Sequence, residues 1–333
     1  MSASGKSRIE PPASYAEWAD LVAATVSHLN VDRKLGIHYW EDWNEPDLGD
    51  FWRASFGEYL RLYDATVEAA LGVDPTIAIG GPAFASFKPI SLANFLEHEA
   101  SLGAHGRADF VSWHAYGRSP DALAEEIKEA RAITERFPIL HPELFITEFN
   151  VLQGGPGDTS VNSNTDKVEG AIALLASIEA MQREHLDRAF LFELKDGLGP
   201  SRYWGRWGIL TNDGSPKPIY HAYKAYQDRP RTRLPIKVLR GPTNGSLGFL
   251  AFGSERRSSL MLWLTGDKAA RVKIALPPEY LGLEYNVTLF DDAHNNPSKS
   301  GDTNLRQSPP RNAGDLVFDL KPNSLVLLTS TGQ

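Results

Sequence analysis

Segments with helix-like and strand-like patterns alternate along the chain from residue 14 to residue 228. Apolar residues recur at helical spacing within 14–30, and Ser14 with Glu17 forms a capping box at its start. Short apolar runs, such as 110–114 and 144–147, lie between the helical segments. Alternation of this kind is typical of parallel strands joined by helical crossovers. We therefore expect an α/β fold built on a parallel sheet in residues 1–230.

The pattern changes after Arg229-Pro230. Residues 231–333 contain short apolar runs separated by Gly, Pro and Asn turns, and they contain no convincing helical periodicity. Such a pattern predicts an all-β sandwich. The predicted domains are thus 1–230 and 231–333.

Composition excludes several classes of protein. Cysteine is absent, so thiolate metal sites and thiol nucleophiles are excluded. The formal net charge of −8 argues against a nucleic-acid partner, which would need a basic face. No apolar stretch suits a membrane span, and residues 1–8 lack the apolar core of a signal peptide. We expect a cytoplasmic protein as the chain is given, with native export left open if its N-terminus is truncated.

Two glutamates stand out because each follows a predicted strand. Glu45 follows 37–44 and Glu148 follows 144–147. In a β/α barrel the carboxyl ends of all strands open on one face, and that face carries the chemistry. The two positions are separated by about three β/α units of roughly 30 residues each. Both carboxyl groups are therefore expected at one end of the barrel.

Cleavage of a glycosidic bond needs two carboxyl groups, one protonated and one ionised, and no cofactor. Glu45 lies in the tryptophan-rich stretch 40–52, and apolar surroundings favour a protonated carboxyl group. Glu148 lies between Thr147 and Asn150 in a more polar stretch, which suits an ionised nucleophile. The pair predicts a glycosidase site.

The residues around both glutamates resemble glycoside hydrolase family 39, a clan A family of β-xylosidases, α-L-iduronidases and exopolysaccharide-cleaving endoglycosidases. The resemblance covers residues 14 to about 228, and a C-terminal sandwich is also expected for that family. It rests on four motifs: Trp43-Asn44-Glu45-Pro46, Gly80-Gly81-Pro82-Ala83, Asp109-Phe-Val-Ser-Trp-His-Ala-Tyr116 and Ile146-Thr-Glu-Phe-Asn150.

The resemblance implies that Glu45 is the acid/base and Glu148 the nucleophile. It also implies that Asn44 binds the hydroxyl next to the anomeric carbon. His114 and Tyr116 would line the site, with Tyr116 positioning the nucleophile. For His114 a structural role in the barrel core is equally compatible with the sequence.

The last predicted barrel strand departs from the family. Phe192 stands where the family usually places a tryptophan platform for the sugar, so the platform is expected from Trp204 or Trp207 in the following loop. Asp42 and Glu193 are rival acids that the sequence leaves open.

Counting from Glu45 predicts an incomplete barrel. In the family the acid ends strand four and the nucleophile ends strand seven, yet only one helical segment precedes residue 37. We therefore expect an incomplete (β/α)8 TIM barrel with about five parallel strands, corresponding to strands 4–8. Open sheet edges tend to pair, so a homo-oligomer that covers the open barrel is expected.

Two functions follow from these observations. The first is a retaining glycoside hydrolase acting on a xyloside-like or exopolysaccharide substrate. The second is a catalytically impaired carbohydrate-binding or scaffolding remnant of a glycosidase. A metal-dependent hydrolase is disfavoured, because the nine histidines are scattered without ligand spacing such as His-x-x-x-His. We expect no metal at the site.

Overall fold

The computed structural model describes most of the chain in two compact units. The described residues are 9–152, 164–199, 202, 206–236, 247–255, 257–280, 283–291, 311–312 and 315–330. The first unit comprises Met1–Tyr116, Ala122–Phe149 and Arg183–Leu191. The second comprises Gly117–Asp121, Asn150–Gln182 and Phe192–Gln333. The boundary predicted between residues 230 and 231 stays a prediction.

The first unit is built on a five-stranded parallel sheet with the strand order β1-β2-β3-β4-β5. Its strands are β1 (Tyr39–Glu41), β2 (Ala78–Phe84), β3 (Phe110–Tyr116), β4 (Glu143–Asn150) and β5 (Arg188–Leu191). Gly80 allows β2 to approach β3 closely, because a Cβ at this position would lie 2.3 Å from the Phe110 carbonyl oxygen. The order matches consecutive β/α units, so the predicted partial TIM barrel is confirmed.

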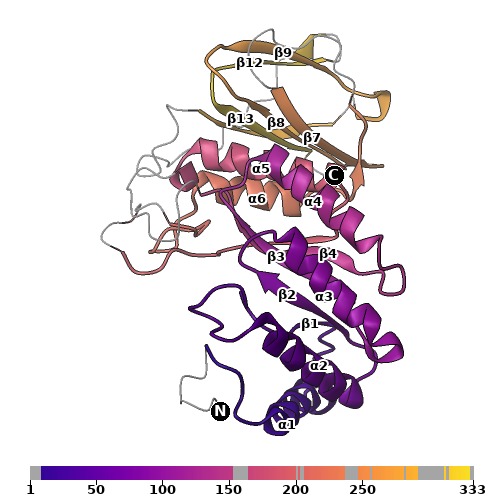
Figure 1. The fold of residues 1–333 in the computed structure, drawn as a ribbon. Helices are drawn as coiled ribbons and strands as arrows, with labels where there is room; N and C mark the ends of the chain where they lie inside the picture. The colour runs from indigo at the N-terminus through magenta and orange to yellow at the C-terminus, as the bar shows by residue number, and fades with distance from the viewer. Residues whose placement is uncertain are drawn as a thin grey trace. The chain divides into compact units, whose positions relative to one another are not determined.

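Helices flank the sheet in the indigo-to-magenta part of Figure 1. They are α1 (Tyr15–Val26, continued by a π-helical turn, Ser27–Asp32), α2 (Phe56–Val73), α3 (Pro89–Ser101) and α4 (Pro120–Thr134). The Ser14 hydroxyl accepts a hydrogen bond from the Glu17 N–H at 3.3 Å, and the Ser55 hydroxyl caps α2 in the same way. The N-terminal cap predicted at Ser14 is therefore confirmed.

Aromatic rings fill the inner face of the sheet. Phe110 stacks on Phe145 with ring centroids 4.4 Å apart, and Tyr39 packs against both rings. The Arg188 guanidinium lies 4.4 Å from the centre of the Tyr39 ring and donates a hydrogen bond to its hydroxyl at 2.9 Å. Tyr39 and Arg188 begin the two edge strands, β1 and β5, so the sheet curls enough for side chains of these strands to meet across its interior. The curl is that of a barrel wall.

Strand β1 is shorter than the sequence predicted. The apolar run 37–44 suggested a strand that ends beside Glu45, but β1 ends at Glu41. As an edge strand, β1 pairs only with β2, so its regular pairing is limited. The backbone nevertheless follows β2 further, because the Glu45 N–H donates to the Ala83 carbonyl at 3.0 Å. Glu45 therefore lies on a loop held against β2.

Within its described residues, the second unit contains two α-helices and a β-sandwich. The helices are α5 (Val168–Arg183, of which Arg183 belongs to the first unit) and α6 (Pro218–Gln227). One antiparallel sheet has the order β10-β13-β8-β7-β6 and the other the order β11-β12-β9. The strands are β6 (Thr232–Arg233), β7 (Leu247–Ser254), β8 (Arg257–Leu264), β9 (Ala270–Ala275), β10 (Tyr285–Phe290), β11 (Arg311–Asn312), β12 (Asp315–Leu320) and β13 (Ser324–Ser330). Leu264 and Leu328 of one sheet share a core with Leu316 and Leu320 of the other, as a sandwich requires.

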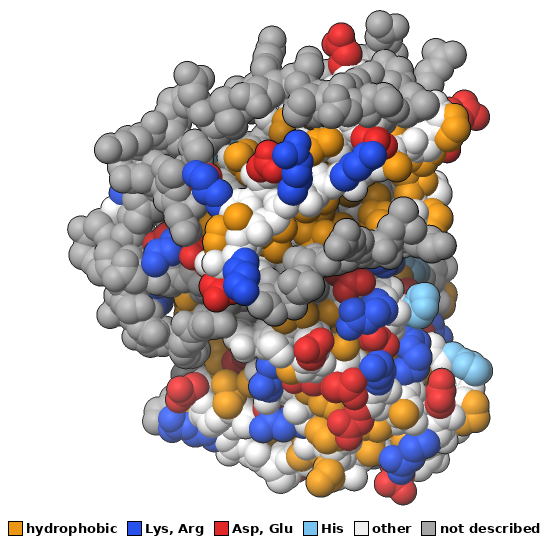
Figure 2. Space-filling view, turned by 90° about the horizontal axis from the view of Figure 1, so that it is seen from above, with side chains coloured by type: hydrophobic (Ala, Val, Ile, Leu, Met, Phe, Trp, Pro, Cys, Tyr) orange, Lys and Arg blue, Asp and Glu red, His pale blue; other side chains and the backbone are white. Residues whose placement is uncertain are grey.

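The surface carries charges of both signs. On the face drawn in Figure 2, Lys and Arg side chains are interspersed with Asp and Glu side chains, and hydrophobic side chains lie between them. Each helix in the described part of the chain is too short or too polar to span a lipid bilayer.

Candidate active site

The loop that carries Glu45 is pinned to the ends of β2 and β3. Besides the bond from the Glu45 N–H to Ala83, the Ala83 N–H donates to the Ser112 hydroxyl at 2.9 Å. The Ala85 N–H donates to the Asp47 carboxylate, also at 2.9 Å. Glu45 and Ala83 both have positive φ angles, 49° and 53°. Non-glycine residues in this conformation are strained and cluster at functional sites, so the local backbone supports a functional role for this loop.

Tryptophans near Glu45 pack against one another. Trp43 makes edge-on contacts with Trp18 and Trp52, at ring-centroid distances of 5.9 and 5.6 Å. Trp52 is buried and contacts Tyr59 of α2. The aromatic cluster therefore fixes the loop to the helices.

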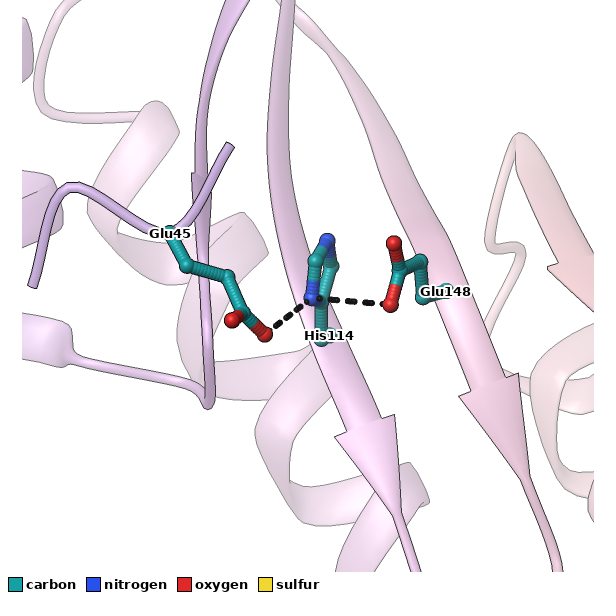
Figure 3. Close-up of side chains that lie close together, drawn as sticks. All are labelled: Glu45, His114 and Glu148. Carbon is teal, nitrogen blue, oxygen red and sulfur yellow. Dashed lines mark hydrogen bonds and ion pairs between the residues drawn. The ribbon is translucent and has the colours of Figure 1, made fainter. Parts of the chain in front are cut away.

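His114 lies between the two glutamates. Its Nδ1 atom is 2.8 Å from Oε1 of Glu45 and 3.4 Å from Oε2 of Glu148, and Figure 3 shows the imidazole between the two carboxylates. Nδ1 can donate to an ionised carboxylate or accept from a protonated one. Only 1% of the side chain is exposed, and Nε2 has no hydrogen-bond partner among the described residues. The sequence left two roles open for His114, a structural role in the barrel core and a place lining the site. The geometry brings its imidazole into contact with both candidate acids.

Glu148 receives a second contact from Tyr116. The Tyr116 hydroxyl donates to Oε2 of Glu148 at 2.6 Å. The register between β4 and β5 shifts between Ile146 and Phe149, and such irregularities re-aim side chains next to active sites. The Glu148 side chain is 27% exposed and that of Glu45 is 13% exposed. The more open and polar setting belongs to Glu148.

The spacing of the two carboxyl groups limits the chemistry. One carboxylate oxygen of Glu45, one of Glu148 and a ring nitrogen of His114 all lie within 4.8 Å of one another. Retaining glycosidases separate their two carboxyl groups by about 5–5.5 Å, and inverting ones by about 6.5–9.5 Å. The spacing is therefore closer to that of retaining enzymes than to that of inverting ones. The same three atoms could also hold one divalent cation.

The rival acid Asp42 is not part of this cluster. Both of its carboxyl oxygens are buried and lack a hydrogen-bond partner within the described ranges. The Thr66 hydroxyl is nearby, but it donates its one proton to the Leu62 carbonyl at 3.0 Å. Burial raises the pKa of Asp42 to about 7.

Tyr116 aside, no hydrogen bond or ion pair among the described residues of the first unit joins the other predicted site residues to the cluster of Glu45, His114 and Glu148. Asn44 precedes Glu45 on the pinned loop and is half-buried. Phe192 and Glu193 belong to the second unit, where the Phe192 ring packs against Trp207 at 5.7 Å. Trp204 lies outside the described residues. Their roles stay predictions.

Two supporting residues escaped sequence reasoning. Ser112 and Asp47 bind the backbone next to Ala83 and so position the Glu45 loop. Alternation along β3 places Ser112 on the same face as His114 and Tyr116, which was a usable signal. No spacing pattern pointed to Asp47.

Comparisons of the sequence with known proteins agree on one family. The sequence profile described as Glycosyl hydrolases family 39 matches residues 4–265. A β-xylosidase from Geobacillus stearothermophilus is 29% identical over 246 residues, which is 66% of this chain and 47% of that protein. A β-xylosidase from Caldicellulosiruptor saccharolyticus is 27% identical over 279 residues, which is 77% of this chain and 55% of that protein.

A monomeric β-xylosidase from Caulobacter crescentus CB15 has a similar fold, with a TM-score of 0.75 and 21% identity. The match covers 97% of this chain and 76% of that one. The chain spans about half the length of the curated β-xylosidases it matches.

Proposed function

This chain belongs to glycosyl hydrolases family 39, and from this we propose that it is a retaining glycoside hydrolase that cleaves O-glycosidic bonds by double displacement. The observation that carries the proposal is the carboxyl pair of Glu45 and Glu148, whose nearest atoms lie within 4.8 Å around His114.

In the first step Glu148 attacks the anomeric carbon while Glu45 protonates the leaving oxygen. The glycosidic bond breaks as the bond to Glu148 forms. Water then attacks the glycosyl-enzyme, with Glu45 removing its proton and Glu148 leaving. The hydrogen bond from Tyr116 at 2.6 Å orients Glu148 and stabilises its charge. His114 lies between the two carboxyl groups, which flank the glycosidic bond in this mechanism.

The proposed substrate is xyloside-like or an exopolysaccharide. The support is the similarity to two β-xylosidases. Asn44, one residue before the acid, is proposed to bind the hydroxyl next to the anomeric carbon. Phe192 and Trp204 are proposed to contact the sugar faces, since aromatic rings pack on the apolar C–H face of sugars.

A mechanism-based label tests the nucleophile. A 2-deoxy-2-fluoro-xyloside with a good leaving group should accumulate as a covalent adduct, and peptide mass spectrometry should find it on Glu148. Asp42→Asn is the matched control, because its carboxyl group lies outside the cluster. A label on another residue, or hydrolysis by Glu148→Gln at the parent rate, would overturn the assignment.

External azide tests the acid. Glu45→Ala should hydrolyse aryl xylosides with good leaving groups and should be accelerated by azide, giving a glycosyl azide of retained configuration. Glu148→Ala with azide should give the inverted one. If Glu45→Ala gave the inverted azide and Glu148→Ala the retained one, Glu45 would be the nucleophile and Glu148 the acid/base.

The alternative is a carbohydrate-binding remnant without turnover. It is favoured by the open edges of the sheet, because β1 and β5 are each paired on one side. It predicts saccharide binding with no covalent intermediate, so detection of the Glu148 adduct would exclude it.

Self-association is proposed to cover these open sides. In the chain before the edge strand β1, the side chains of Leu21, Val31 and Leu35 are more than half exposed. Apolar side chains of this kind mark interfaces when they gather in a patch. Light scattering coupled to size exclusion should give a mass of at least two chains, and a strictly monomeric mass would exclude the proposal.

A further inference from the structure

A second cluster of ionisable side chains lies on the helices of the first unit. Asp64 comes from α2, and His98 and Glu99 come from the last turn of α3. The His98 Nε2 atom is 3.1 Å from both carboxylate oxygens of Asp64 and 4.0 Å from Oε1 of Glu99. One donor atom from each residue lies within 4.8 Å of the other two. Three potential ligands therefore converge on one point.

Glu99 is the unusual member of this cluster. Its side chain is fully buried, with an exposed fraction of 0%. Oε2 accepts a hydrogen bond from the Arg107 N–H at 3.0 Å, while Oε1 faces the cluster without a partner in the part of the chain that the structure describes. The Arg107 guanidinium is engaged elsewhere, since its Nε bonds to Asp109 at 2.8 Å. A buried carboxyl group of this kind either keeps a proton, and burial raises the pKa of Glu99 to about 8, or is compensated by a cation.

We propose that Asp64, His98 and Glu99 bind a divalent transition-metal ion, with Zn²⁺ as the best match. One imidazole and two carboxylates form a ligand set that suits Zn²⁺ better than Ca²⁺ or Mg²⁺, which prefer oxygen alone. Ligands at about 2.0–2.2 Å from zinc lie roughly 3–4 Å from each other, and the donor separations of 3.1 and 4.0 Å fit this range. Two carboxylates with a neutral imidazole also match the charge of the ion.

The cluster is open enough for an ion to enter. The side chains of Asp64 and His98 are 36% and 28% exposed, which leaves room for a water as the fourth ligand. The ion would also lie at the C-terminal end of α3, where the helix dipole favours positive charge. Bound there, it would link α2 to α3. Because it binds only the folded chain, it would stabilise the first unit by mass action.

The test uses the full chain carrying Glu148→Gln, because the glutamates and His114 offer a competing set of ligands. The chain is stripped with EDTA, and ZnCl₂ is titrated in a calorimeter. Binding of one zinc per chain is expected, together with a rise in Tm. Adding His98→Asn should weaken binding by more than about tenfold, the loss typical for disturbed metal sites, and should reduce the rise in Tm at the same zinc concentration.

Two further variants make the outcome decisive. His105→Asn removes an exposed histidine just beyond α3 and should leave zinc binding unchanged. Glu99→Gln keeps an acceptor for the Arg107 N–H, so it should fold but bind zinc weakly. If the stripped chain binds no zinc, or if His98→Asn binds it like the parent, the three residues form only an internal ion pair and the proposal fails.

Discussion

The Tyr116 hydroxyl donates a hydrogen bond of 2.6 Å to the Glu148 carboxylate from the neighbouring strand. A hydrogen bond to a charged group contributes about 1.5–3 kcal/mol. Tyr116→Phe removes it while keeping the ring, so kcat/KM on an aryl xyloside should fall by roughly 10–100-fold, with most of the loss in kcat. Steady-state kinetics measures the effect.

Tyr223→Phe, on the half-buried side of α6, is the matched control and should keep the parent kinetics. A Tyr116→Phe variant with unchanged kcat would mean that the bond does not act on the nucleophile.

A second prediction concerns the imidazole between the glutamates. His114→Ala removes the group within 2.8 Å of Glu45 and 3.4 Å of Glu148, leaving two carboxylates that repel each other. We expect a fall in kcat of about 100-fold, which corresponds to roughly 3 kcal/mol, and a changed pH profile. His114→Asn can place an amide donor near the position of Nδ1 and should recover part of the activity. Equal losses in both variants would indicate a role in packing alone.

Much of this site could be predicted from the sequence because parallel strands present their carboxyl ends at one edge. Glu45, His114 and Glu148 follow from that rule together with alternation along β3. The early end of β1 could not be predicted, because it depends on which side of the strand is paired. The cluster of Asp64 with His98 also escaped, since these residues lie 34 positions apart and meet only when α2 and α3 pack.

The buried carboxyl group of Asp42 should make stability depend on pH. Its pKa rises from 3.8 to about 7 on folding because it is buried. Between these values the folded chain keeps a proton that the unfolded chain has lost, so stability falls as pH rises from about 4 to 7, by a few kcal/mol at most. Above pH 7 the full loss is present.

Asp42→Asn cannot ionise and should remove most of that fall. Unfolding followed by circular dichroism from pH 4 to 9 should show a higher Tm for Asp42→Asn than for the parent at pH 8. Asp20→Asn, at an exposed aspartate of α1, serves as the control. Parallel curves for Asp42→Asn and the parent would show that Asp42 is not the group that titrates.

Lys217 holds together the segments that precede α5 and α6 in the second unit. Its ammonium pairs with Asp166 at 2.7 Å and with Asp196 at 2.8 Å, and all three side chains are at most 7% exposed. Lys217→Met removes the ammonium that pairs with two buried carboxylates, which should cost about 3–5 kcal/mol in urea-induced unfolding. Lys224→Met breaks an exposed pair with Asp228 and should barely change stability. If the two variants unfolded at the same urea concentration, the buried pairs would not support the fold. If Lys217→Met regained stability when combined with Asp166→Asn and Asp196→Asn, the loss would be traced to the buried carboxylates.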